Sequence, residues 1–166
     1  MKPIAFIDSE IDPKTHKVLD LGAVRADGAM FHNRSIAQFQ EFLQGTEIVC
    51  GHNIINHDLK FIGDAVRAAG VRAAIDTLFW SPLLYPTKPY HRLVKDDKLD
   101  PENSNNPLND SLNARDLFHD EVAAFQKVSD QLKEIFYRLL NDKKEFGSLF
   151  RYLGYTGAQG SPEISI

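Results

Sequence analysis

The chain has 166 residues, of which 43% are hydrophobic and 25% charged, and its formal net charge is −4. This length suits one compact domain of ordinary globular composition, with no apolar run near the roughly 20 residues of a membrane span. The negative charge argues against a protein that binds nucleic acid mainly through a basic surface, but not against an enzyme that gathers carboxylates around bound cations. No targeting segment is evident, and the lone Cys50 cannot form an internal disulfide, so we expect a cytoplasmic protein without membrane contact.

The N-terminal part has the pattern of three short antiparallel strands. Residues 4–8 and 17–25 flank the turn-prone Asp12-Pro13-Lys14, and residues 29–32 follow the Asp27-Gly28 turn signal. Ser35 is a typical helix N-cap, and apolar residues recur after it at helical spacing up to Gly45. A strand over residues 47–50 follows.

Helices and strands alternate in the middle of the chain. Helical spacing after Asn56 ends at Gly70, a strand over residues 74–78 comes next, and this alternation predicts an α/β fold. Residues 81–109 are rich in proline, so we expect loops there, with a short helix near 91–98. From Asp110 to about Leu140 the apolar spacing predicts one long helix or two abutting ones. We assign residues 1–154 to one domain and residues 155–166 to a flexible tail.

Four carboxylates fall at the ends of predicted elements. Asp8 and Glu10 alternate on one face at the end of the first strand, where two carboxylates can share a divalent cation. Such pairs are more often solvated surface, so the pair alone identifies no site. Asp58 lies at a strand-to-helix junction and Asp110 opens the long helix, although each also fits an ordinary acid at a helix N-terminus.

In this order and spacing the residues resemble the DEDD (RNase T-like) superfamily of 3′–5′ exonucleases, which includes oligoribonuclease and the proofreading subunit of DNA polymerase III. Phe6 to Glu10 resembles the first motif, an Asp-x-Glu after an apolar strand. His52 to Asp58 resembles the second motif with extra residues, and Asp76-Thr77-Leu78 is similar to a segment that follows it in many members. Asn105 to Ser111, with the helix after it, resembles the third, so the resemblance spans residues 4–125.

The resemblance implies an RNase H-like mixed β-sheet, with three antiparallel strands first, flanked by helices. It implies hydrolysis of the terminal phosphodiesters of single-stranded DNA or RNA to nucleoside 5′-monophosphates, with two divalent cations, Mg²⁺ or Mn²⁺. Asp8 would bridge both cations, Glu10 and Asp110 would complete one site, and Asp58 would support the other. The expected substrate contacts are Ser9, Ile11, Asn53, His57 and Asn105. Nucleic acid with single-stranded 3′ ends is the expected partner, and because similar modules occur fused to helicases, so is fusion to or association with a helicase.

Two residues depart from the family pattern. Ile11 stands where many members have threonine, and Asn105 stands five residues before Asp110, where the best-known branch has a histidine that takes a proton from water; an amide cannot do this. A rival alignment uses His91 and Asp96, but Pro101 interrupts the helix that should follow, so Asp110 is favoured.

The other histidines and the function itself leave alternatives open. His52 and His57 could support the ligands or contact substrate, whereas His119 is expected on the surface. One alternative function is a catalytically weak exonuclease-fold domain that binds nucleic-acid ends or a partner protein. Another is an unrelated α/β protein with chance acidic clusters.

Overall fold

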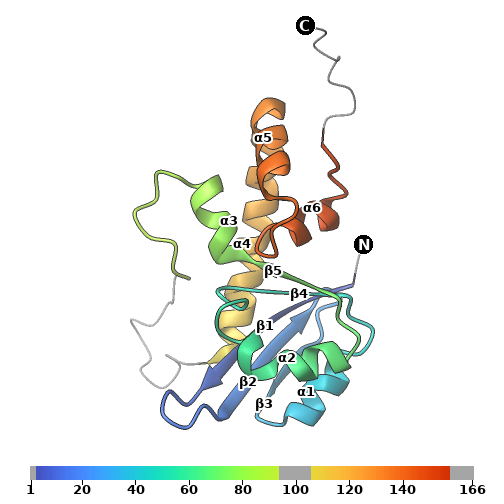
Figure 1. Ribbon diagram of the computed structural model, residues 1–166. Helices are drawn as coiled ribbons and strands as arrows, with labels where there is room; N and C mark the ends of the chain where they lie inside the picture. Colours follow the sequence, from blue (N-terminus) through green and yellow to red (C-terminus); the bar gives the residue numbers. More distant parts are fainter. Residues whose placement is uncertain (1–2, 94–105, 158–166) are drawn as a thin grey trace, which may run out of the picture.

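The computed structural model describes residues 3–93 and 106–157 and shows an α/β fold (Figure 1). Five strands form one mixed sheet in the order β3-β2-β1-β4-β5. They are β1 (Ile4–Ile11), β2 (Val18–Arg25), β3 (Met30–Asn33), β4 (Ile48–Gly51) and β5 (Ala73–Asp76). The first three strands pair antiparallel, and β4 and β5 join them in parallel with β1. The α/β class and the opening of three antiparallel strands are therefore confirmed.

Helices cover both faces of the sheet (Figure 1). They are α1 (Ile36–Phe42), α2 (Leu59–Ala68), α3 (Thr77–Leu84), α4 (Pro107–Lys127), α5 (Asp130–Leu140) and α6 (Gly147–Leu153). Alternation along β1 divides the core, because Ala5 and Ile7 pack with α1 and α2 while Phe6 packs with α3, α4 and α6. The predicted N-cap at Ser35 is confirmed, since its side chain accepts a hydrogen bond from the Gln38 N–H.

Helix α3 was not predicted, because the sequence pattern indicates a strand up to Leu78 and a loop from Ser81. The structure ends β5 at Asp76, whose side chain caps α3 by accepting the Leu78 N–H at 3.0 Å. Pro82 lies inside this helix and removes one backbone donor, but the helix ends two residues later and its Trp80 is fully buried. Burial of the Trp80 indole and the cap at Asp76 therefore stabilise α3 by more than Pro82 destabilises it.

The C-terminal helical region consists of two abutting helices, which confirms one of the two predicted alternatives. Helix α4 ends at Lys127, and Ser129 caps α5 by accepting the Leu132 N–H. Residues 91–93 are not helical; the remainder of the short helix expected near 91–98, together with Asp96 and Asn105, falls outside the described residues. Tyr155 packs its ring against Phe125 and Phe150.

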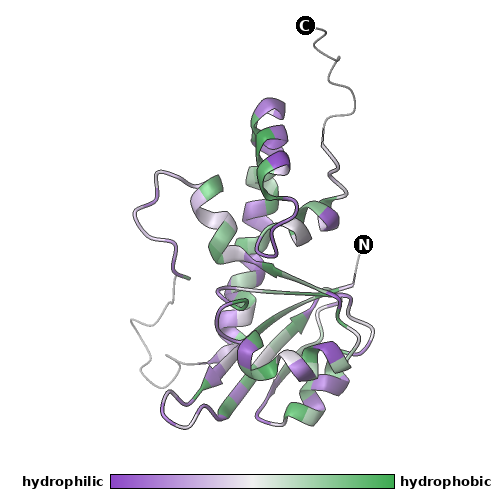
Figure 2. Cartoon of the chain, viewed as in Figure 1, coloured by the Kyte–Doolittle hydropathy of each residue, from purple (hydrophilic) through white to green (hydrophobic). Residues whose placement is uncertain are grey.

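Helix α5 stands beyond the sheet and is amphipathic, with hydrophobic and hydrophilic sides that Figure 2 distinguishes. Its apolar side is partly open to solvent, because Leu132, Ile135 and Leu139 are all exposed. Within residues 3–93 and 106–157, no helix combines the length and the apolar character needed to cross a membrane.

Candidate functional site

The first two candidate carboxylates share one face of β1. Asp8 and Glu10 alternate with buried residues on the same side as Phe6, whose ring contacts Phe118 of α4 at 5.4 Å between centroids. Both acids are only partly buried. Their side chains therefore lie at the end of the sheet on the face that α4 covers.

A glycine on the neighbouring strand brings α4 to the same place. Gly22 pairs directly with Asp8. A Cβ atom on Gly22 would lie 2.2 Å from both the backbone nitrogen of Leu108 and the carbonyl carbon of Pro107, so no other residue leaves room for this contact. The start of α4 thus rests on β2 directly beside Asp8.

The first turn of α4 is fixed by its own cap. The Asn106 side chain accepts the N–H groups of Leu108 at 3.0 Å and Asn109 at 3.3 Å, and Pro107 follows at the first helical position. Asp110 lies within this turn. The packing on Gly22 therefore carries Asp110 to the face that holds Asp8 and Glu10.

Asp58 reaches β1 from the opposite face. It is 2% exposed, and its Oδ1 accepts the backbone N–H of Ser9 at 2.8 Å and also the Ser9 hydroxyl. Burial raises the pKa of Asp58, although the hydrogen bonds from Ser9 and the nearby His57 ring oppose this. Ser9 lies between Asp8 and Glu10 in β1, so its side chain points to the opposite face of the sheet, where α2 packs. The Asp58 carboxylate therefore binds β1 at Ser9 from the α2 side. The Ser9 hydroxyl is already engaged in this bond.

The loop that leads to Asp58 is organised by Asp76. The backbone N–H groups of Asn53 and Ile55 donate to the Asp76 carboxylate at 2.8 and 3.0 Å, in addition to the capping bond from Leu78. Burial raises the pKa of Asp76, while these backbone donors lower it. Asn53 has a positive φ of 65°, which the bonds to Asp76 help to maintain. Asp76 therefore sets the path of the second motif.

Two histidines contact hydroxyl groups of α3. His52 Nδ1 lies 2.8 Å from the Thr77 hydroxyl, and His91 Nδ1 lies 2.8 Å from the Ser81 hydroxyl. Burial lowers the pKa of His52, while Asp76, the His91 backbone and Asp110 act to raise it. His52 thus links the second-motif loop to α3 and to the segment that follows it.

The remaining candidates are spread around this centre. Ile11 is buried at a bulge between Glu10 and Ile11. His57 is half exposed, with its Nδ1 3.5 Å from Asp58 Oδ2. His119 is exposed, as predicted.

The candidate carboxylates do not form a compact ligand set. Across residues 3–93 and 106–157, no three His, Cys, Asp or Glu side chains are grouped closely enough to hold a metal ion. Carboxylate oxygens are nevertheless the ligands that Mg²⁺ and Mn²⁺ prefer. Asp8 and Glu10 lie on the face of β1 that α4 covers, and Asp110 lies in the first turn of α4, whereas Asp58 bonds to Ser9 between Asp8 and Glu10.

Sequence reasoning missed two residues on this face. Asp20 pairs with Glu10 across the strands, and its Oδ2 lies 2.6 Å from His32 Nε2 on β3. Gly22 gave a usable signal, because a glycine inside an apolar strand indicates a close approach by another backbone. The position of Asp20 depends on the strand register, which the sequence alone did not fix.

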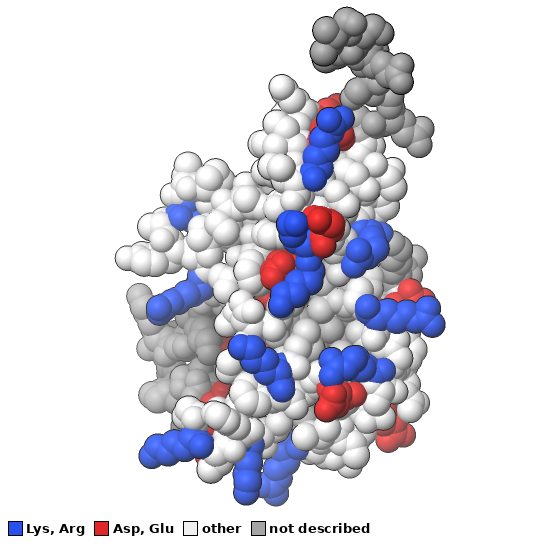
Figure 3. All heavy atoms as spheres, viewed as in Figure 1, with Lys and Arg blue, Asp and Glu red and all other residues white. Residues whose placement is uncertain are grey.

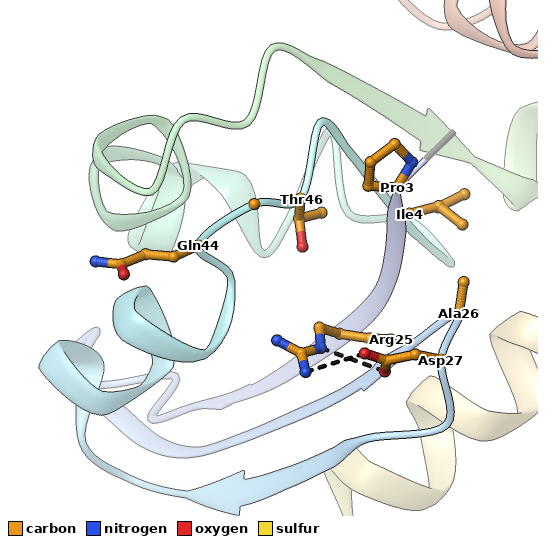
Figure 4. Close-up of a pocket in the computed structure, with 8 residues that line it drawn as sticks. Pro3, Ile4, Arg25, Ala26, Asp27, Gln44 and Thr46 are labelled. Atoms are coloured by element: carbon orange, nitrogen blue, oxygen red, sulfur yellow. Dashed lines mark hydrogen bonds and ion pairs between the residues drawn. The ribbon is translucent and has the colours of Figure 1, made fainter. Parts of the chain in front are cut away.

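A cavity of about 340 Å³ at the start of β1 and the end of β2 has none of these residues in its wall (Figure 4). It is lined by Pro3, Thr46 and the ion pair between Arg25 and Asp27, whose closest atoms are 3.1 Å apart. Figure 3 shows the lysines and arginines of the viewed face spread singly, several of them beside an acidic residue. On that face, positive charge does not form one continuous tract.

Comparisons with known proteins give a distant structural likeness. No protein-family model matches the chain, and no curated protein matches it in sequence. Among solved structures the chain is similar to the family B DNA polymerase from the hyperthermophilic archaeon Pyrobaculum calidifontis, with 15% sequence identity and a TM-score of 0.46. The match covers 75% of this chain and 25% of the polymerase chain, so the chain spans about a quarter of that protein. A likeness of this extent carries no argument about function.

Proposed function

We propose that the protein is a metal-dependent 3′–5′ exonuclease with an RNase H-like fold, acting on single-stranded DNA or RNA to release nucleoside 5′-monophosphates. The observation that carries the proposal is the packing of the first turn of α4 on Gly22, directly beside Asp8. This packing gathers acidic residues from distant segments on one face. Like charges so placed repel one another, and a divalent cation bound among them would relieve this repulsion.

Asp8, Glu10 and Asp110 would hold two divalent cations, Mg²⁺ or Mn²⁺, with Asp58 supporting them from the Ser9 side. When bound, such cations lower the pKa of a water molecule and stabilise charge on the leaving oxygen. Because the described carboxylates are not grouped as a ligand set, we expect cation binding to draw them together. β1 and the capped first turn of α4 are the fixed parts of this arrangement.

The chain's own residues would position the substrate beside these carboxylates. His57 is half exposed next to Asp58, and Asn53 lies in the loop held by Asp76, so both are available to contact the terminal nucleotide. Ile11 is buried and Ser9 is bonded to Asp58, so they would act by shaping the end of β1.

The test is incubation of end-labelled single-stranded DNA and RNA with Mg²⁺, Mn²⁺ or EDTA. We expect stepwise shortening from the 3′ end with either cation and none with EDTA. Asp8→Asn and Asp110→Asn should abolish it. Asp64→Asn is the matched control, because Asp64 is a fully exposed acid on α2 that pairs only with Arg67 among the ion pairs seen. Full activity in Asp110→Asn, with the fold verified by thermal unfolding, would contradict the proposal.

The second candidate is a catalytically weak domain of the same fold that binds nucleic-acid ends or a partner protein. The lack of a grouped set of three metal-binding side chains, in the part of the chain that the structure describes, favours it. The same assay separates the two functions. Binding of the labelled strand without release of any nucleotide, in either cation, would identify the binding domain.

A further inference from the structure

A cavity of about 450 Å³ runs along α4 next to the candidate carboxylates. One wall is the face of α4 that carries Asn113 and Leu117, and the other is the segment 88–93 that follows α3. Asp110, Asn113 and Leu117 recur at positions i, i+3 and i+7, so they lie on one face of the helix. The cavity therefore begins about one turn after Asp110.

The outer wall of this cavity presents an aromatic ring to solvent. Tyr90 lines the cavity and is 79% exposed. Lys88 and Arg92, two residues to either side, also line it and are exposed. An exposed ring with cations next to it in sequence suits single-stranded nucleic acid, since the ring can stack on a base and the cations can contact phosphates. The Lys88 ammonium itself lies 4.1 Å from the centroid of the Tyr85 ring.

The inner wall has a different character. Asp116 and Asp120 line it beside Asn113, and Asp116 forms an ion pair with Arg115 at 2.9 Å. Carboxylates repel phosphate groups but accept hydrogen bonds from the amino groups of bases. The interior therefore suits an uncharged nucleobase with polar edges, and the cationic rim suits the sugar-phosphate backbone attached to that base.

The wall that carries Tyr90 is anchored to the candidate site. The His91 ring bonds to Ser81 of α3 at 2.8 Å, and the His91 backbone interacts with His52. His52 directly precedes Asn53, whose backbone N–H donates to Asp76 in the loop that leads to Asp58. A ligand stacked on Tyr90 would thus be held close to the carboxylate face.

We infer that the cavity between α4 and residues 88–93 is a nucleobase subsite, in which Tyr90 stacks on a base of the substrate strand on the 5′ side of the terminal nucleotide. The inference rests on the proposed function for the identity of the strand. Binding at the subsite can nevertheless be measured without hydrolysis, so the two proposals can fail separately.

The experiment compares Tyr90→Ala with Tyr90→Phe. Binding of fluorescein-labelled oligothymidylate and oligouridylate is followed by anisotropy in EDTA and in Ca²⁺. Loss of the ring should raise Kd about ten-fold or more, whereas phenylalanine should stay within about two-fold. Leu139→Ala, which truncates an exposed side chain on α5, is the matched control and should leave Kd unchanged.

A hydrolysis arm separates subsite binding from chemistry. For an oligonucleotide, Tyr90→Ala should raise KM by the same factor as Kd. The p-nitrophenyl ester of thymidine 5′-monophosphate has no upstream base, so its hydrolysis should be unchanged. Equal losses on both substrates would overturn the inference, because Tyr90 would then act on the fold or on the carboxylate centre.

Other outcomes also decide the matter. A wild-type Kd in Tyr90→Ala, or no strand binding by the wild type, would overturn the subsite. Binding of thymidine 5′-monophosphate that depends on Tyr90 as strongly as strand binding does would show a site for free nucleotides instead. Strand binding that depends on Tyr90, without hydrolysis of either substrate, would support the subsite and refute the exonuclease.

Discussion

Gly22→Ala tests whether the packing of α4 on β2 assembles the site. The added methyl group would lie 2.2 Å from the backbone of Leu108 and of Pro107. Neither neighbour can swing aside as a flexible side chain would, because both contacts are with backbone atoms. Helix α4 or strand β2 must therefore move.

The size of the movement follows from the contact. Carbon atoms pack at about 3.5–4.0 Å, so the first turn of α4 has to retreat by at least about 1 Å. Overpacking of this kind costs about 1–3 kcal/mol of stability. A misplacement of about 1 Å at a catalytic group can cost about 10²-fold in rate, so activity should fall much further than stability.

The assay pairs urea unfolding with exonuclease rate. Gly63→Ala is the control, because its methyl group would meet only the end of the flexible Arg67 side chain, at 3.1 Å. In the interior of α2 that change should be neutral or stabilise by up to about 1 kcal/mol. If Gly22→Ala lowered the free energy of unfolding but kept a rate within a few-fold of wild type, the position of Asp110 beside Asp8 would not matter for activity.

Three further predictions concern buried and linking groups. Burial and the charge of Asp76 raise the pKa of Glu121 from 4.5 to about 9, so the folded state keeps a proton that the unfolded chain loses, and stability falls as pH rises through that window. In urea unfolding, the free energy of unfolding of Glu121→Gln relative to wild type should therefore rise by up to about 1.4 kcal/mol per pH unit between pH 5 and 8. A difference independent of pH would contradict this. Asp76→Ala leaves three backbone N–H groups without their acceptor and should lower the free energy of unfolding by about 2–4 kcal/mol in the same assay; a loss below about 1 kcal/mol would refute its role in the loop. If the His91 ring takes the proton from the attacking water, His91→Ala should lower the hydrolysis rate at neutral pH at least about ten-fold. An unchanged rate, together with a higher rate in Asn105→His, would place the base at position 105 instead.

Much of the fold could be predicted because local sequence decides it. The apolar run that begins β1, the cap at Ser35 and the turn signal at Asp27-Gly28 each act over a few residues, and the structure retains all three elements. Helix α3 could not be predicted in this way. Its proline argues against a helix locally, whereas burial of Trp80 against Phe125 and Phe150 is a tertiary effect.

The candidate site shows the same division. Period-two alternation was enough to place Asp8 and Glu10 on one face. The sequence could not indicate that Asp58 would bond to Ser9 from the other side, because this depends on the path of the loop that Asp76 holds. Nor could it show that a glycine on β2 seats Asp110, since the contact joins segments far apart in the chain.

Spatial position also bears on whether His91 or position 105 supplies the general base. In sequence, His91 and Asp110 belong to competing alignments, because the motif places its histidine five residues before its aspartate. In the structure, Asp110 lies in the capped first turn of α4, and His91 lines the same cavity as Asn113, which is about one helical turn after Asp110. One segment can therefore supply the acid and another the histidine, with no fixed spacing between them. An asparagine at position 105 then does not by itself deprive the site of a base.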